Sequence, residues 1–221
     1  MKLTHKRELL IYYLRAMKKI TFACLTTLML NLGCTPEEQV LNIGFGSCNE
    51  PNQTQHLLPT LDKALDSLDH FIWLGDNIYL NNEQWNSYDS TMARYNTVFG
   101  QPIFRDLLSK SHHLAIWDDH DAGPNDCDLS TFSGYSTTMR AFKDFWEPDY
   151  PQPNSNSYYG QTSTAGGLVD IYLLDNRSFR THKDSTNATV FGVEQLNWFH
   201  NTLSNSMAKV HRSEEHTSEL Q

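Results

Sequence analysis

Four consecutive apolar residues, Phe71–Leu74, stand between His70 and Gly75. A strand that is apolar on successive residues is buried on both faces, like the strands of parallel sheets that are covered by helices. Leucines at helical spacing precede this run, at Leu57–Leu68, and a second helical segment follows it, at Gln84–Phe99. A buried strand between two helices predicts an α/β domain.

The same alternation continues along the chain. Further strands are predicted at Val40–Cys48, His113–Trp117 and Gly167–Leu174, and further helices at Ile103–Lys110, at Met139–Trp146 and from about Val193. The segment 147–167 is rich in Pro, Asn, Ser and Gly, which predicts a loop. We expect the tryptophans at 73, 117 and 146 to lie in the core of about one domain.

Polar residues follow three of these strands, at the point where each strand ends. They are Ser47-Cys48, Gly75-Asp76-Asn77 and the acidic run Asp118–Asp121. Because sites form at the carboxyl ends of strands in parallel sheets, we expect these side chains to lie close together. Carboxylates at such short range repel one another unless a cation neutralises them. The sequence therefore predicts a site for a pair or cluster of polyvalent cations, with Asp76 as the natural bridging ligand.

The charge of the chain excludes one class of partner. It carries 17 basic and 26 acidic side chains and a formal net charge of -9. We expect no nucleic-acid partner, because general binding to nucleic acid depends on neutralising phosphates. The turn "GFGSC" at 44–48 lacks the Lys-Ser/Thr of a phosphate-binding loop, and it is not a G-x-S-x-G esterase elbow. Nucleotide binding by that loop and serine-esterase chemistry are therefore not supported.

The N-terminal segment has the features of an export signal. From Met17 it contains two lysines, an apolar stretch at Ile20–Leu32, and Gly33 before Cys34. This layout is typical of a secretory signal, and the apolar stretch is short for a membrane span. Its end resembles the lipobox of bacterial lipoproteins. We therefore expect lipidation at Cys34, a polar tether over 34–39 and export to a membrane-anchored position in the periplasm or at the cell surface; a plain signal peptide is the alternative. Residues 1–33 would combine a misassigned start with the signal peptide.

The C-terminal residues 212–221 have no apolar periodicity. We interpret them as a non-native tail in coil conformation, with a natural polar tail as the alternative. The segment 40–211 would then be a partial domain. Its last helix is predicted to pack through four residues at helical spacing: Val193, Leu196, Phe199 and Leu203.

Four motifs occur in one order along the chain: "FGSC", "FIWLGDNIY", "WDDHDAGPND" and "LLDNRSFR". Together they resemble the alkaline phosphatase D (PhoD-like) family of calcineurin-type metallophosphatases, over roughly Asn42–Leu203. The resemblance implies an α/β fold, a four-layer αββα metallophosphatase sandwich. This sandwich would be incomplete here, because a family motif with Gly, Asp and His that should follow the last helix is missing. It also implies an exported hydrolase of small phosphate esters, and we expect a monomer.

Carried over by position, the resemblance also implies metal ligands. Iron would be bound by Cys48 and by the phenolate of Tyr79, and Asp76 would bridge it to a second ion, calcium or another divalent metal. Asp119 and Asn125 would serve the second ion.

The remaining site residues concern the substrate. His120 would be the catalytic residue near the substrate, able to protonate the leaving oxygen. Arg177 would either bind the substrate phosphate or have a structural role. The expected reaction is hydrolysis of a phosphomonoester or phosphodiester by a metal-bound hydroxide.

Several alternatives stay open at this point. The chain could be a non-catalytic surface lipoprotein that binds metal or glycans, or a metallohydrolase that acts on another ester. Cys48 could be a core thiol, or it could pair with Cys127 in a disulfide. Asp118 and Asp119 could divide between metal ligand and helix cap.

Overall fold

Three parallel strands form the first sheet of the segment Leu41–Gln221, the larger of the two units into which the chain divides. The computed structural model describes residues 40–50, 63–148, 150–182 and 184–214. The strands lie in the order β1 (Ile43–Gly46), β2 (His70–Leu74) and β3 (His112–Ile116). The three predicted strands are therefore confirmed.

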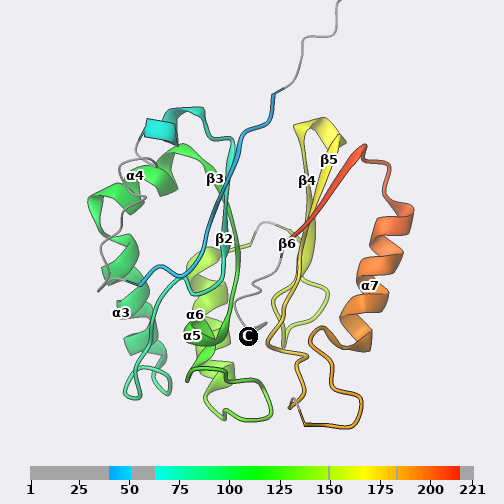
Figure 1. Cartoon of the computed structure of the whole chain (residues 1–221). Coiled ribbons are helices and arrows are strands. Elements are labelled where there is room, and N and C mark those ends of the chain that lie inside the picture. The colour runs from blue at the N-terminus through cyan, green and yellow to red at the C-terminus, as the bar shows by residue number, and fades with distance from the viewer. Residues whose placement is uncertain (1–39, 51–62, 149, 183, 215–221) are drawn as a thin grey trace, which may run out of the picture. The chain divides into compact units, whose positions relative to one another are not determined.

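The register of this sheet aligns the strand ends. Gly46 of β1 lies level with Trp73 of β2, and Trp73 lies level with Ala115 of β3. All three strands run in the same direction, so their carboxyl ends meet at one edge of the sheet (Figure 1). The polar segments that follow them start from this common edge.

A second sheet contains β4 (Gly160–Thr164), β5 (Val169–Leu173) and β6 (Val210–Glu214), in that order. β4 is antiparallel to β5, from which the short 3-10 turn η2 (Ala165–Gly167) separates it, and β6 is parallel to β5. The prediction of a loop over 147–167 is wrong for β4. Its sequence, GQTST, is polar and contains Gly and Ser, which are uncommon in strands. The pairing with β5 overrides this weak local preference.

Helices cover the outer faces of both sheets (Figure 1). The first sheet is covered by α3 (Tyr88–Phe99), α4 (Pro102–Lys110) and α6 (Tyr135–Trp146), and the second by α7 (Gly192–Asn205). The two sheets lie between these helices, which confirms the predicted αββα layering. α3 begins four residues later than predicted, because Ser87 is its N-cap and its side chain accepts from Ser90 N at 3.2 Å.

Two further elements complete the described chain. α5 (Asp119–Ala122) is a single turn that follows β3 and was not predicted as a helix. Of the predicted helix at Leu57–Leu68, residues 57–62 lie outside the described residues, and the remainder contains the 3-10 turn η1 (Leu65–Ser67).

The core between the first sheet and its helices is aromatic. Trp73 is buried on β2, and its ring lies 5.0 Å from Phe99 and 5.7 Å from Trp146, between centroids. Trp117 is fully buried and Trp146 is half-buried against the same cluster. The prediction that these three tryptophans belong to the core is confirmed.

Asp175 joins the two sheets and the last helix. Its Oδ1 accepts a hydrogen bond from Trp117 Nε1 at 2.9 Å, across the sheets. Its backbone N–H donates to Gln195 Oε1 of α7 at 2.7 Å, and its carbonyl accepts from Gln195 Nε2 at 2.8 Å. A polar side chain on α7 thus satisfies the backbone at the end of β5, where unpaired buried groups would be costly.

The face of α7 that packs on the sheet differs from the predicted one. Val193 is 75% exposed and Leu196 is 45% exposed, so the prediction that they pack is wrong. The buried positions of the helix are Gly192 and Gln195, while Phe199 and Leu203 are half-buried. The double hydrogen bond of Gln195 to Asp175 turns the helix toward this side.

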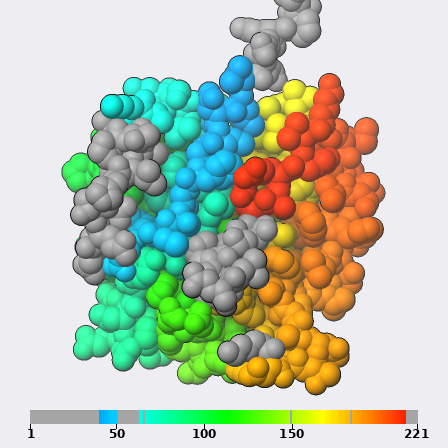
Figure 2. Space-filling model, in the orientation of Figure 1, coloured from blue at the N-terminus to red at the C-terminus, as the bar shows by residue number. Residues whose placement is uncertain are grey.

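β6 corrects the expectation of a coil from residue 212 onward. Arg212–Glu214 continue the strand, paired with Ile171–Leu173 of β5, and Glu214 is buried. The Arg212 guanidinium lies over the Phe45 ring of β1, 4.7 Å from its centroid, and the two strands lie side by side in Figure 2. The prediction is therefore wrong for these three residues, and residues 215–221 lie outside the described residues. Backbone pairing explains the strand, because it requires no apolar periodicity.

The leader and the tether, residues 1–39, also lie outside the described residues, so the signal peptide and the lipidation of Cys34 stay predictions. In the part of the chain that the structure describes, no helix has the length and apolar character to cross a membrane.

The environment of His113 on β3 predicts a pH-dependent stability. Its Nδ1 accepts from Trp73 Nε1 at 3.1 Å, so its Nε2, 2.9 Å from the Leu107 carbonyl oxygen, is the nitrogen that carries the proton. Burial lowers the pKa of His113, and the nearby His112 and His70 lower it further, against the Leu107 carbonyl, which raises it. The folded chain therefore favours the neutral ring.

The sign of the effect follows from this lowered pKa. Stability from His113 is fully present above the unfolded pKa of about 6.5, and it is lost as the pH falls through that value toward the folded pKa. We expect His113→Gln to remove up to about 1.4 kcal/mol per pH unit of the slope of unfolding free energy below pH 6.5. Urea unfolding at several pH values measures it. The exposed His182→Gln is the control, and an unchanged slope in the His113 variant would contradict the expectation.

Candidate metal centre

The segments after β1 and β2 run side by side at the carboxyl edge of the first sheet. Cys48 N donates to the Gly75 carbonyl at 3.2 Å, and Asn49 N donates to the Asp76 carbonyl at 2.8 Å. Cys48 and Asp76 both have a positive φ, 54° and 51°. Such values are uncommon for residues other than glycine. They place the Cys48 Sγ 3.8 Å from Asp76 Oδ2.

Asp76, Asp119 and His120 form a group with the geometry of a cation site. Each offers one ligand atom, and these atoms lie within 4.8 Å of one another. Both aspartates are buried and His120 is half-buried. Two buried carboxylates at this range repel each other, so a cation between them would be stabilising. Carboxylate and imidazole donors suit divalent and trivalent metals of intermediate hardness, and the residues present therefore fit a metal.

Tyr79 lies against the same group. Its hydroxyl donates to Asp76 Oδ2 at 3.3 Å, and its ring centroid is 4.3 Å from that of His120. Burial raises the pKa of the Tyr79 phenol, and the charges of Asp76 and Cys48 raise it further. A cation at this place would oppose that effect, because it favours the phenolate.

Asp119 is held at both of its carboxylate oxygens. Oδ1 accepts from Arg177 Nη2 at 3.2 Å, and Oδ2 accepts from Asp126 N at 2.6 Å. Asp118, one residue earlier, is the N-cap of α5 and forms an ion pair with Arg177 Nε. Of the two roles that the sequence left open, the structure thus gives Asp118 the helix cap and places Asp119 in the cation group.

Arg177 is fully buried, at 0% exposure. Besides the two carboxylates, its Nη1 donates to the Cys127 carbonyl at 3.2 Å. A guanidinium without solvent exposure cannot meet a substrate that arrives from solvent. The geometry therefore favours the structural alternative over the substrate-binding role predicted for Arg177.

Asn125 is exposed, and its Nδ2 donates to Asp126 Oδ2 at 2.7 Å. The backbone of Asp126 in turn contacts Asp119, so Asn125 lies one residue from the carboxylate group. Its role as a ligand of a second ion stays a prediction.

Cys48 and Cys127 form no disulfide in the described part of the chain. Cys48 is exposed at the strand edge, whereas Cys127 is buried and its Sγ lies 3.6 Å from the Asp119 carbonyl oxygen. Burial raises the pKa of the Cys127 thiol to about 12, against the nearby Arg177, which lowers it. The disulfide alternative is therefore not realised, and Cys127 behaves as a core thiol.

Asp121 is a site residue that the sequence analysis did not single out. It is fully buried, and its two oxygens accept from Asn77 N at 3.1 and 3.3 Å, from Ile78 N at 3.2 Å and from Asp118 N at 3.0 Å. It therefore ties the loop that carries Asp76 to the turn that carries Asp119. The spacing Asp118-x-x-Asp121 is that of a capping box, a signal that could have identified it.

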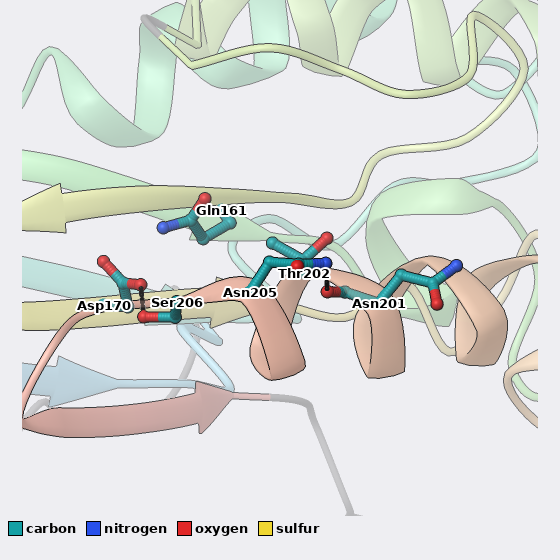
Figure 3. Close-up of a pocket in the computed structure, with 6 residues that line it drawn as sticks. All are labelled: Gln161, Asp170, Asn201, Thr202, Asn205 and Ser206. Atoms are coloured by element: carbon teal, nitrogen blue, oxygen red, sulfur yellow. Dashed lines mark hydrogen bonds between the residues drawn. The ribbon is translucent and has the colours of Figure 1, made fainter.

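A polar pocket of about 390 Å³ lies elsewhere, between the second sheet and the end of α7 (Figure 3). Its lining residues are Gln161, Asp170, Asn201, Thr202, Asn205 and Ser206. Several of its polar groups pair with one another or with α7: Ser206 Oγ donates to Asp170 Oδ2 at 2.5 Å, and Asn205 Nδ2 donates to the Asn201 carbonyl at 2.8 Å. None of the predicted site residues lines it. We interpret it as a structural packing feature of α7.

Fold and site together define a two-sheet α/β sandwich with a buried acidic group at the carboxyl ends of parallel strands. The sequence profile of the PhoD-like phosphatases matches residues 45–212, and the chain belongs to that family. No protein with curated functional information matches it.

Two solved structures are similar to this fold. One, titled "Structure of PhoD", has a TM-score of 0.62 and 18% sequence identity, with 78% of this chain and 41% of that chain covered. The chain thus spans about two fifths of the length of that relative. The other is the purple acid phosphatase PPD1 from yellow lupin (Lupinus luteus) seeds, with a TM-score of 0.47, 11% identity, and 76% and 28% of the two chains covered. The likeness to PhoD bears out the predicted α/β sandwich.

Proposed function

We propose that this chain is a metal-dependent phosphatase that hydrolyses small phosphate esters, monoesters or diesters. The convergence of Asp76, Asp119 and His120 at the carboxyl edge of the first sheet carries the proposal. Membership of the PhoD-like phosphatase family supports it.

Two ions are proposed for the site. Iron would be held by the Cys48 thiolate, the Tyr79 phenolate and Asp76, and calcium or another divalent ion by Asp76, Asp119 and Asn125. The contacts of Cys48 Sγ and Tyr79 OH with the same oxygen, Asp76 Oδ2, support this grouping. When bound, such ions would lower the pKa of a coordinated water and stabilise the charge that develops on the phosphoryl oxygens.

The chain's own residues would orient the substrate and move a proton. Asp76 and Asp119 would hold their oxygens fixed, because both side chains are buried. His120 is half-buried, and it offers a ring nitrogen to the same group. This places an imidazole where it can protonate the leaving oxygen of the ester.

The ligand assignment predicts a visible colour. Thiolate or phenolate bound to ferric iron gives a charge-transfer absorption, whereas aspartate and histidine ligands do not give it at comparable strength. We expect the iron-loaded chain to absorb in the visible, Tyr79→Phe to shift or remove the phenolate band, and Cys48→Ser to remove the thiolate band. Absorption spectra and metal analysis of the three proteins measure this. Iron-loaded protein without visible absorption would contradict the assignment.

The activity itself is tested with p-nitrophenyl phosphate and bis-p-nitrophenyl phosphate on metal-loaded chain. Hydrolysis of either that requires metal supports the proposal, and the ratio of the two rates decides between monoesterase and diesterase. Stoichiometric metal binding without hydrolysis would favour the alternative, a non-catalytic metal-binding lipoprotein.

A further inference from the structure

We propose that Arg177 is a positioning residue that fixes the orientation of Asp119 for cation binding and does not contact phosphate. The inference rests on the proposed function, because it concerns one ligand of the proposed metal site. It goes beyond that function, because it assigns a role to a buried side chain on the opposite sheet.

The geometry begins at the end of β5. Arg177 follows this strand by four residues, and its backbone N–H donates to Asp175 Oδ1 at 2.9 Å. The same oxygen accepts from Trp117 Nε1 at 2.9 Å, at the end of β3. The backbone of Arg177 is thus fixed relative to the strand that leads to Asp119.

From this fixed point the guanidinium reaches three acceptors at once. Nε donates to Asp118 Oδ1, Nη1 to the Cys127 carbonyl and Nη2 to Asp119 Oδ1. Only the planar, forked guanidinium presents donors in these separate directions. With Asp126 N at the other oxygen of Asp119, the carboxylate is gripped from two sides and cannot rotate freely.

Arg177 also balances charge, and the two roles must be separated. One cation faces two buried aspartates, 118 and 119, so the three side chains carry a net charge of about -1 when all are ionised. Removing Arg177 alone would leave two buried carboxylates without it, which is strongly destabilising whatever its role at the metal site. A single truncation therefore cannot distinguish positioning from charge balance.

The double variant Asp118→Asn/Arg177→Met separates them. It keeps the net charge of the group, because one cation and one anion are removed together, and Asn still caps a helix well. Asp119 keeps its charge but loses the Arg177 hydrogen bond. If Arg177 positions Asp119, this variant folds and binds Ca²⁺ about 10- to 100-fold more weakly than wild type, the usual effect of removing an outer-shell partner of a metal ligand.

The experiment titrates the full chain with Ca²⁺ by calorimetry and follows metal-free unfolding in urea. Asp118→Asn alone is the control for the cap position, and it should bind Ca²⁺ as wild type does. Arg177→Lys is the second variant in case the double variant does not fold. Lysine keeps the charge but not the fork, so it should also weaken Ca²⁺ binding.

The outcomes distinguish the two proposals. Folded variants that bind Ca²⁺ as tightly as wild type would overturn the positioning role and leave the proposed function intact. A wild-type chain that binds neither Ca²⁺ nor other divalent ions would overturn both. Weaker binding in the double variant and in Arg177→Lys, with an unchanged Asp118→Asn control, supports the inference.

Discussion

Substituting Asp76 by asparagine is expected to abolish metal binding and phosphatase activity while leaving the fold intact. Asp76 has a φ of 51°, and asparagine is among the residues that tolerate this left-handed conformation best. The amide has nearly the shape of the carboxylate, but it lacks the charge that a bridging ligand contributes. Because altering only an outer-shell partner costs about 10- to 100-fold, we expect losses of more than about 100-fold in kcat/KM and in metal affinity.

The same substitution has an opposite effect on stability. The Asp76 carboxylate is one cause of the raised pKa of Asp121 and of Tyr79, so its charge is repulsive to the metal-free site. We expect metal-free Asp76→Asn to unfold at the same temperature as wild type or higher. Thermal unfolding, metal titration and ester hydrolysis measure the three effects. Asp66→Asn, at an exposed aspartate of η1, is the matched control. Full activity in the Asp76 variant would contradict the proposed site.

Substituting Asp121 by alanine is expected to cost at least about 3 kcal/mol of unfolding free energy. The side chain accepts from the backbone N–H groups of Asn77, Ile78 and Asp118, all in the interior. Each buried donor left without an acceptor costs about 1–3 kcal/mol. A typical domain is stable by only about 5–15 kcal/mol, so the loss is a large part of the total.

Asparagine at 121 separates shape from hydrogen bonding. Both oxygens of Asp121 face N–H donors, so an amide would direct its own NH₂ toward one of these sets. We expect Asp121→Asn to be less stable than wild type and more stable than Asp121→Ala. Urea unfolding of the metal-free proteins measures both. An Asp121→Ala variant within about 1 kcal/mol of wild type would refute the proposed bracing of the two loops, since this is less than the cost of the donors it strands.

Some of the structure follows from local pattern. The apolar run Phe71–Leu74 predicted a strand buried on both faces, and β2 is the central strand of the first sheet. The predicted meeting of Cys48, Asp76 and Asp119 followed from one rule, that parallel strands share a carboxyl edge. The contact of Cys48 with Asp76, and the grouping of Asp76 with Asp119, bear out that expectation.

Other features depend on partners that are distant in sequence. β4 and β6 have polar sequences, and they are strands because β5 lies between them. The packing side of α7 is set by the bond of Gln195 to Asp175, which apolar spacing does not encode. For the same reason, spacing indicated Val193 and Leu196 as packing residues, whereas both are exposed.

The sequence by itself therefore determined the class of fold, the strand ends where the polar residues gather, and the residue types that suit a cation. Hydrophobic periodicity and strand direction are local or nearly local properties, and they can be read from one segment at a time. Only the tertiary structure decided which carboxylate caps a helix, which braces two loops and which faces the cation group. Those roles depend on burial and on donors such as Arg177, 58 residues away from Asp119 in the chain, which only folding brings within hydrogen-bonding distance.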